Sequence, residues 1–290
     1  MRPQHWLTSR FTLDLSTPRV MGIVNVTPDS FSDGGQHATT AAARAHCEQL
    51  VGEGADILDI GGESTRPGSP AVPLDEELAR VLPVLRHAVT LGVPVSVDTL
   101  KPEVMRQALD LGCDIINDIW ALRRPGALEA VAGHASCGVC LMHMHGNPQT
   151  MQLDPMAGDP VAPVHAFLAE RAAALVAAGV AAERITLDPG IGFDKTVKQN
   201  FALLARQQEA VPAGHAVLAG WSRKSSLGAV TGLAAGDRLA PSLAAAVLAV
   251  ERGAAVVRVH DVAATVAALR VVRAMRAGEP AQMAGAAGGQ

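Results

Sequence analysis

The stretch that decides the fold is residues 22–35, "GIVNVTPDSFSDGG", near the N-terminus. Its first half is an apolar run rich in β-branched residues, which predicts a strand buried on both faces. Asn25 interrupts that run, and the second half becomes a polar loop that carries Asp29 and Asp33 and ends in Gly34 and Gly35. The stretch therefore raises the question of why a buried strand should carry an amide and open into an acidic loop.

The same unit, a short apolar run followed by a longer Ala- and Leu-rich amphipathic segment, recurs along the whole chain. We expect strands near 20–26, 55–60, 93–97, 114–118, 138–143, 184–188, 215–220 and 255–260. We expect helices near 39–54, 75–91, 101–111, 125–134, 160–179, 196–209, 238–253 and 262–276. Eight such units predict an α/β fold, a (β/α)8 TIM barrel, rather than an open doubly wound sheet, and no GxGxxG follows any strand.

The two ends of the chain depart from this repeating unit. Weak alternation in residues 1–19 predicts a short N-terminal hairpin that plugs the bottom of the barrel. No linker interrupts the rest, so residues 1–276 are predicted to form a single domain. Residues 277–290, "AGEPAQMAGAAGGQ", are small and polar enough to predict a disordered tail.

Composition narrows the class of protein. Hydrophobic residues make up 49% of the 290 residues and aromatic residues only 3%, so the core must be aliphatic, as in parallel sheets. A net charge of −4 with both signs interspersed argues against a nucleic-acid partner. No apolar run reaches the roughly 20 residues of a membrane span. The four cysteines resemble buried apolar residues of a reducing compartment, so we expect a cytoplasmic protein.

Nearly every predicted strand delivers polar residues at its carboxyl end, where TIM barrels place their chemistry. In chain order these are Asn25 and Thr27, Asp59, Asp98, Asn117 and Asp118, His143 and His145, Asp188, Ser222 to Ser225, and Arg258 with His260. Single acidic residues here are often helix N-caps, and Asp261 is best interpreted as one. Capping does not explain a polar residue inside an apolar run, because burying one unpaired costs about 1–3 kcal/mol. Four positions of that kind predict a ligand site: Asn25, Asp98, Asn117 and Arg258.

The residue types predict a site with two unlike halves. Asp98, Asn117 and Asp188 are acceptors for a planar, nitrogen-rich ring, because a carboxylate pairs with an amino group and an adjacent ring N–H. Lys224, Arg258 and His260 form a cationic cluster after the last two strands, where barrels commonly bind phosphate. We therefore expect a heterocycle on the acidic side and an anionic group on the basic side.

These motifs, taken in order, resemble those of bacterial dihydropteroate synthase, a family of pterin-binding TIM barrels. The resemblance rests on "NVTPDSFSDGG" (25–35), "GGESTRPGS" (61–69), "SVDTLKPEV" (96–104), "NDI" (117–119), "LMHMHGNPQTMQ" (141–152), "DPGIGF" (188–193), "SRKS" (222–225) and "RVHDV" (258–262). The resemblance extends from about residue 20 to 275 and includes a motif at the end of every predicted strand. Any one motif would be weak evidence, but the ordered set is specific.

The resemblance implies a folate-pathway transferase and sulfonamide target. Such an enzyme joins (7,8-dihydropterin-6-yl)methyl diphosphate to 4-aminobenzoate and releases 7,8-dihydropteroate and diphosphate. It also implies a Mg²⁺ ion bound through Asn25, small-molecule substrates as the partners, and a homodimer.

The resemblance further implies a role for each matching residue. The pterin ring would contact Asp98, Asn117, Asp188 and Lys224. The diphosphate would contact Asn25, Thr65, Arg258 and His260. The aminobenzoate pocket would be lined or bordered by Phe31, Arg66, Pro67, Phe193 and Ser225. The catalytic residues would be Asp33, Lys224, Arg258 and His260, with the 25–35 loop closing over the site.

Several alternatives compete with this interpretation. "CGVC" (137–140) has the spacing of a redox or zinc site, and "HMH" (143–145) places two imidazoles on one strand face. Both are better explained as core, because the first lies in an apolar strand and the second has no evident third ligand. Two other functions remain open: a pterin-dependent methyltransferase relative, and a non-catalytic paralogue that binds a pterin without turnover.

Overall fold

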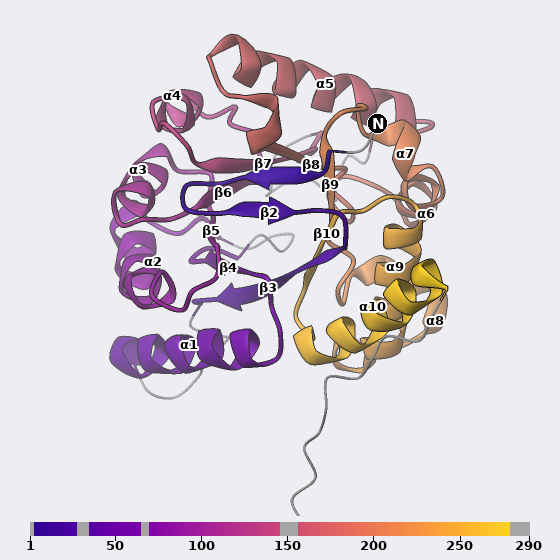
Figure 1. The fold of residues 1–290 in the computed structure, drawn as a ribbon, viewed down its shortest axis with the longest axis horizontal. Helices are drawn as coiled ribbons and strands as arrows, with labels where there is room; N and C mark the ends of the chain where they lie inside the picture. Colours follow the sequence, from indigo (N-terminus) through magenta and orange to yellow (C-terminus); the bar gives the residue numbers. More distant parts are fainter. Residues whose placement is uncertain (1–2, 28–34, 65–69, 146–155, 279–290) are drawn as a thin grey trace, which may run out of the picture.

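The computed structural model describes residues 3–27, 35–64, 70–145 and 156–278, with side chains from residue 39 onward in the first helix. In this part of the chain eight parallel strands close into a barrel in the order β10-β3-β4-β5-β6-β7-β8-β9 (Figure 1). They are β3 (Arg19–Asn25), β4 (Ile57–Gly61), β5 (Val95–Asp98), β6 (Ile115–Asp118), β7 (Gly138–Met142), β8 (Ile185–Asp188), β9 (Ala216–Ala219) and β10 (Val256–Val259). The predicted TIM barrel is confirmed, and each predicted strand overlaps an observed one.

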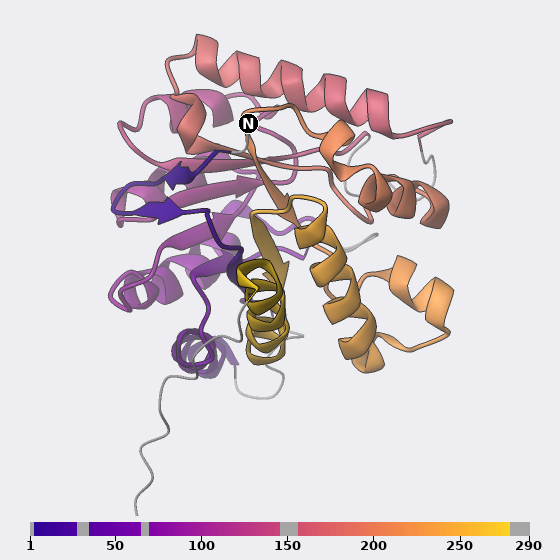
Figure 2. The ribbon, with the colours of Figure 1, turned by 45° about the vertical axis from the view of Figure 1, so that its right-hand side comes forward.

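Helices surround the strands, as Figures 1 and 2 show. They are α1 (Gly35–Gly52), α2 (Leu74–Ala88), α3 (Pro102–Asp110), α4 (Ala127–Ala132), α5 (Val161–Ala177), α6 (Val197–Ala205), α7 (Gln207–Ala210), α8 (Ser225–Thr231), α9 (Leu239–Glu251) and α10 (Val262–Ala277). Two differ from expectation. The helix predicted over 196–209 breaks at Arg206, whose φ of −118° and ψ of 31° are not helical. The short α8 was not predicted, because residues 222–225 were interpreted only as the end of a strand.

The strands are buried on both faces, as their unbroken apolar character predicts. Every residue of β4 and of β7 is buried. One face of each strand meets the surrounding helices and the other meets the barrel interior, so neighbouring residues join different cores. Cys137 belongs to the outer core and Cys140 to the interior, which explains "CGVC" as packing on opposite sides.

The hairpin predicted for the N-terminus is present and covers the amino end of the barrel (Figure 1). It consists of β1 (His5–Leu7) paired antiparallel with β2 (Thr12–Asp14). Trp6 and Leu13 pack against the interior residues Met21 and Ile57. The indole Nε1 of Trp6 also donates a hydrogen bond to the carbonyl oxygen of Arg184 at 2.9 Å. The hairpin therefore seals this end with apolar surface and one satisfied polar group.

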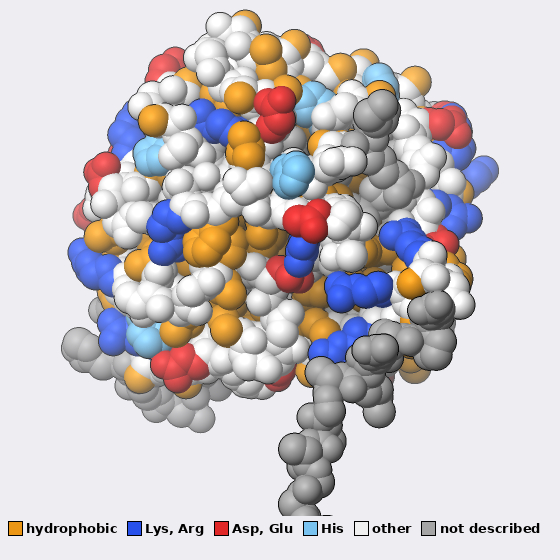
Figure 3. Space-filling model, viewed as in Figure 1, with side chains coloured by type: hydrophobic (Ala, Val, Ile, Leu, Met, Phe, Trp, Pro, Cys, Tyr) orange, Lys and Arg blue, Asp and Glu red, His pale blue; other side chains and the backbone are white. Residues whose placement is uncertain are grey.

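The remaining expectations about the chain concern its surface and its C-terminal end. No helix in the described ranges is long and apolar enough to cross a membrane. The hairpin face shows acidic and basic side chains interspersed, without one dominant sign (Figure 3). Helix α10 extends to Ala277, and of the predicted tail only residues 277 and 278 belong to the described part.

We predict that Trp6→Ala destabilises the fold while leaving the barrel mouth intact. Trp6 has no exposed surface, so truncation should lower the free energy of unfolding by about 3–5 kcal/mol through lost burial and a cavity. Urea denaturation measures this change. As a control, Val176→Ala on α5, at a side chain that is 48% exposed, should change it by less than about 0.5 kcal/mol. Equal effects of the two substitutions would contradict a sealing role for the hairpin.

Candidate active site

The register of the barrel brings the polar strand ends to one level. Asn25 lies opposite Gly61, Gly61 opposite Asp98, and Asp98 opposite Asn117 on successive strands. On the adjacent strands β7 and β8, Met142 pairs with Asp188 at the same end. Because parallel strands all end at the same side, the side chains predicted from separate motifs share one mouth. Of this group Asp98, Asn117 and Asp188 are buried, and Asn25 is half-buried.

Arg258 lies among the acidic residues rather than apart from them. Its Nε donates to Asp59 Oδ2 at 2.6 Å, and its Nη2 donates to Asp98 Oδ2 at 2.8 Å. Asn117 Nδ2 donates to the same Asp59 oxygen at 3.2 Å. The expected division into an acidic and a basic half is therefore modified, because the guanidinium links the two. Asp59, which the sequence placed at a strand end without a role, is the centre of this network.

Burial and neighbouring charge set the ionisation of the mouth. Burial raises the pKa of Asp98 to about 7; Arg258 opposes that rise, while the carboxylates of Asp59, Asp118 and Glu77 add to it. Burial also raises the pKa of Asp188, against the backbone N–H of Gly190, which donates to Asp188 Oδ1 at 2.7 Å. Both acids are therefore easier to protonate than exposed carboxylates, and a ligand with N–H donors would favour their charged forms.

Lys224 and Phe193 form a second wall of the mouth. The Lys224 ammonium lies 4.2 Å from the centre of the Phe193 ring. Burial lowers the pKa of Lys224 to about 8, and the Asp188 carboxylate limits that fall. Phe193 packs with Ile119, Met142 and Met144 in a small apolar cluster beside the polar strand ends. A flat ring can therefore meet apolar side chains on its faces and carboxylates at its edge. Sequence reasoning missed Ile119 and Met142, because they belong to apolar runs like any core residue.

His260 is a neutral hydrogen-bond donor rather than the cation expected from the sequence. Ser222 Oγ accepts from the backbone N–H of His260 at 3.1 Å and lies 3.0 Å from its ring Nδ1. The hydroxyl has one proton to donate and a second lone pair, so its role toward Nδ1 depends on the tautomer of the ring. Burial, followed by the charges of Arg258 and Arg223, lowers the pKa of His260 to about 3. The basic cluster near pH 7 therefore consists of Arg258 and Lys224.

A buried lysine that the sequence did not single out holds the loop after β8. Lys195 Nζ lies 2.9 Å from the carbonyl oxygens of Gly190 and Phe193 and 3.0 Å from His143 Nδ1. Burial lowers the pKa of Lys195 to about 7, and burial and Lys195 lower that of His143 to about 2. A Cβ at Gly190, whose φ is +71°, would lie 1.9 Å from the His143 carbonyl oxygen. His143 is thus explained by contacts within the fold, and the loop carrying Phe193 is tied to β7.

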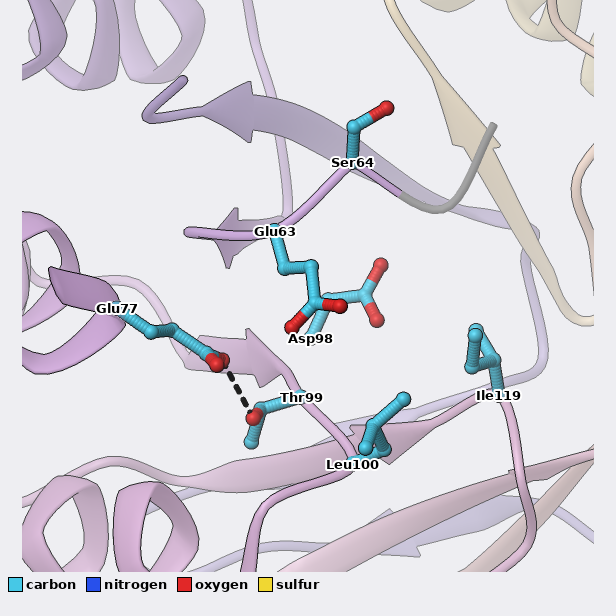
Figure 4. Close-up of a pocket in the computed structure, with 7 residues that line it drawn as sticks. All are labelled: Glu63, Ser64, Glu77, Asp98, Thr99, Leu100 and Ile119. Carbon is cyan, nitrogen blue, oxygen red and sulfur yellow. Dashed lines mark hydrogen bonds between the residues drawn. The ribbon is translucent and has the colours of Figure 1, made fainter. Parts of the chain in front are cut away.

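A pocket beside Asp98 is bounded by a second charged cluster (Figure 4). Lys101 Nζ donates to carboxylates of both Glu63 and Glu77, and Thr99 Oγ1 donates to Glu77 Oε1 at 2.6 Å. Glu77 is fully buried on α2, so these bonds tie the segment after β4 to α2 and to the start of α3. In Figure 4, the Glu63 side chain projects from that segment toward Asp98, whereas the Ser64 hydroxyl points away from it. Sequence periodicity does not reveal this cluster, because its members come from the segment after β4, from α2 and from the connection between β5 and α3.

Helix capping does not account for the polar strand ends. The N-cap residues of α2, α3 and α5 are Pro73, Lys101 and Pro160. Asp261 occupies the N-cap position of α10, as predicted, although its side chain makes no capping hydrogen bond. Its carboxylate instead accepts from Arg223 Nη2 at 2.6 Å.

Several predicted site residues are not tested by this geometry. Phe31, Asp33, Thr65, Arg66 and Pro67 lie outside the described residues. Ser225 is exposed at the first position of α8, directly after Lys224. Within the described ranges there is no group of three or more His, Cys, Asp or Glu side chains that could hold a metal ion. Asn25, at the end of β3, is a single oxygen donor at the mouth.

Comparison with known proteins agrees with this site. A family model of pterin binding enzymes matches residues 21–260. Dihydropteroate synthase of Neisseria meningitidis is 51% identical over 276 residues, covering 93% of this chain and 97% of that protein. The Escherichia coli enzyme is 50% identical and covers 91% and 93%.

Solved structures agree over a similar length. Burkholderia cenocepacia dihydropteroate synthase, complexed with 7,8-dihydropteroate, superposes with a TM-score of 0.87 at 54% identity and covers 95% of this chain and 98% of that one. The Xanthomonas albilineans enzyme with 4-aminobenzoic acid gives the same TM-score and identity over 92% and 96%.

The fold and the site thus define a pterin-binding barrel. Within that class, the chain belongs to the dihydropteroate synthase family, as its motifs predicted. The methyltransferase alternative has no support, because the relatives that match nearly the whole chain are synthases.

We predict that the His260 ring stays neutral between about pH 5 and pH 8, because burial and the charges of Arg258 and Arg223 disfavour its protonation, and that the Ser222 hydroxyl donates to Nδ1 and so leaves the ring proton on Nε2. Long-range ¹H–¹⁵N NMR should show Nδ1 as an unprotonated nitrogen across this range. In Ser222→Ala the ring should lose this fixed tautomer and show both. A protonation midpoint near 6.5 in the unsubstituted protein would contradict the assignment.

Proposed function

We propose that this chain catalyses the condensation of (7,8-dihydropterin-6-yl)methyl diphosphate with 4-aminobenzoate, which yields 7,8-dihydropteroate and diphosphate. The observation that carries this proposal is the agreement of about 50% with dihydropteroate synthases over nearly the whole chain. The site chemistry supports it, because acceptors for a nitrogen-rich ring and donors for an anion share one mouth. The following residue roles belong to the same proposal.

The pterin ring binds in the mouth between polar and apolar walls. Asp98, Asn117 and Asp188 accept hydrogen bonds from its amino and ring N–H groups, while Lys224 donates to its carbonyl side. Phe193 and Met142 pack near its faces. The raised pKa values of Asp98 and Asp188 suit this role, because charge-assisted hydrogen bonds from the ring restore the ionised carboxylates.

The diphosphate departs on the side of Arg258 and His260. Arg258 supplies full positive charge that is already in place, and His260 supplies an Nε2–H donor. Because the charge of Arg258 and the donor of His260 are already in position, they stabilise the departing oxygen and do not need to reorganise in the transition state. Of the predicted diphosphate contacts, Thr65 comes two residues after Glu63 in the sequence and lies outside the described residues.

The carbon–oxygen bond breaks before the new carbon–nitrogen bond forms. The methylene is attached to an electron-rich ring, which delocalises the positive charge left behind by diphosphate. Asp98 and Asp188 stabilise that charge, with Asp33 as a third acid supplied by the 25–35 loop. The aniline nitrogen of 4-aminobenzoate is neutral near pH 7, so the reaction needs no strong general base.

Mg²⁺ would be held by Asn25 together with the diphosphate rather than by the protein alone. Magnesium often keeps several waters and takes only one or two protein ligands beside substrate phosphates, and the single oxygen donor at the end of β3 fits that mode. When bound there, the ion would neutralise charge on the leaving diphosphate. Asn25 lies at the level of Gly61 and Asp98, so the ion would be held at that level of the mouth.

The remaining implications of the family are also proposals. Phe31, Arg66, Pro67, Phe193 and Ser225 border the aminobenzoate pocket, where a sulfonamide would compete. A homodimer is supported by the exposed apolar side chains of α9 and α10, Leu239, Leu248, Val271 and Met275. A cytoplasmic location is supported by four free, buried cysteines.

We predict that diphosphate release requires both substrates and the metal. The protein with pterin diphosphate, 4-aminobenzoate and Mg²⁺ should release diphosphate and form dihydropteroate in equal amounts. Omission of 4-aminobenzoate should abolish dihydropteroate formation, because the pterin cation then has no amine to add to it. Removal of the metal by a chelator should reduce turnover by at least about 100-fold, because charge on the leaving diphosphate is then not neutralised. Binding of the pterin diphosphate without any product would support the non-catalytic paralogue instead.

We predict that Asp188→Ala and His260→Ala fail in different ways. The first removes a charge-assisted contact to the ring and should weaken binding of a free pterin by about 10- to 100-fold. The second should leave free-pterin binding within about threefold, while raising the KM for pterin diphosphate by about tenfold or more. Calorimetry with the free pterin and steady-state kinetics measure the two effects. The same loss of free-pterin binding in both variants would contradict the two-part site.

A further inference from the structure

Asp59 lies below the mouth rather than in it. It is the third residue of β4 and lies opposite Ile23 and Ser96, whereas the mouth-level residue of β4 is Gly61, opposite Asp98. Two residues along a strand correspond to roughly 6.6 Å. The Asp59 side chain has no exposed surface. A substrate resting at the level of Asp98 therefore does not touch Asp59.

One oxygen of Asp59 orders two site residues from different strands. Oδ2 accepts from Arg258 Nε on β10 at 2.6 Å and from Asn117 Nδ2 on β6 at 3.2 Å. A carboxylate only accepts hydrogen bonds, so both neighbours must turn an N–H toward it. Its other oxygen, Oδ1, and the hydroxyl of Ser96 opposite are buried with no hydrogen-bond partner in the part of the chain that the structure describes.

For Asn117 the consequence is a fixed amide orientation. The amide nitrogen and oxygen point in different directions from the same carbon, so a nitrogen turned down toward Asp59 leaves Oδ1 facing the mouth. Asn117 then offers an acceptor to the ligand, not a donor. A neutral amide at residue 59 would present both a donor and an acceptor, and the Asn117 amide could take either orientation.

For Arg258 the consequence is a fixed rotation of the guanidinium. Arg258 starts low in the barrel, opposite Met21, and its stem passes Asp59 on the way to Asp98. Nε is taken by Asp59 and Nη2 by Asp98, while no described residue accepts from Nη1. Nη1 is thus the part of the guanidinium left to an anionic group, and Asp59 determines its direction.

We propose that Asp59 is a positioning residue of this active site: it sets the acceptor polarity of Asn117 and the rotation of Arg258, and through them the recognition of pterin diphosphate. This inference rests on the proposed function. The simpler alternative is that Asp59 only neutralises a buried guanidinium, which would affect stability but not the choice or affinity of the ligand.

Asp59→Asn tests the proposal, because it keeps size and removes the charge. The KM for pterin diphosphate should rise about 10- to 100-fold, with a fall in kcat, while the KM for 4-aminobenzoate should stay within about twofold. Ser96→Ala is the matched control, since it removes a buried polar group at the same level that orders no site residue. It should leave both KM values within about twofold.

The pH profile provides a second readout, of the charge that Asp59 places beside Asp98, whereas the KM values distinguish positioning from simple neutralisation. Asp98 is faced by Arg258, Asp59, Asp118, Glu77 and Lys224. Burial raises its pKa to about 7, so kcat/KM for the unsubstituted enzyme should fall as the pH drops through about 7, where Asp98 takes up a proton. Removing the like charge of Asp59 lowers that pKa, so the acid limb of Asp59→Asn should move to lower pH by about half a unit or more.

The outcomes separate this inference from the function on which it rests. If the unsubstituted enzyme forms no dihydropteroate, the proposed function fails. If it is active and Asp59→Asn keeps its KM for pterin diphosphate, only the positioning role is overturned, and a change in melting temperature or in the pH profile without a change in KM has the same meaning. Should Asp59→Asn not fold, Asp59→Ser, which is smaller and still accepts a hydrogen bond, takes its place with the same expectations. If neither variant folds, Asp59 is a folding residue and the proposal is wrong.

Discussion

A guanidinium inside a barrel must be neutralised where it lies, and Arg258 meets that requirement through Asp59 and Asp98. Burial alone would lower the pKa of Arg258, but the two carboxylates outweigh burial and raise it, so the side chain keeps its charge. The same ion pairs limit how far burial can push Asp98 toward its neutral form. The electrostatics of the mouth depend on this arrangement. Without Arg258 the acids would take up protons, and without the acids a buried cation would be too costly to keep.

The fold was predictable from the sequence because it depends on a pattern repeated eight times. Parallel strands covered on both faces must be apolar throughout, so a polar residue in such a run, like Asn25 or Asp98, marks the mouth. The ordered motifs then identified the family. Two local features were not predicted. Helix α8 is short and contains a glycine at position 228, and the backbone of Arg206 leaves the helical conformation where its side chain bonds to Asp159 and Glu209.

Prediction of the site was more uneven, for a physical reason. Sequence spacing says which residues reach the mouth but not which of them bond to one another. Arg258 and His260 were expected to act as a pair, yet one reaches the acids and the other bonds to Ser222. The charge of His260 could not be predicted either, because its neutral state follows from burial and from the nearby charges of Arg258 and Arg223. Lys195 gave no signal in the sequence, since its partners are backbone carbonyl oxygens.

The sealed amino end of the barrel has a further consequence for how this chain can be combined with others. The hairpin begins at that end, and α10, which runs back from the mouth, finishes at Ala277 on the same side. Both connections therefore leave the barrel opposite the site. A second folded unit fused before His5 or after Ala277 would sit beneath the barrel, where Trp6 and Leu13 already close the interior. Gene fusion or tethering to a neighbouring enzyme would then leave substrate entry unobstructed.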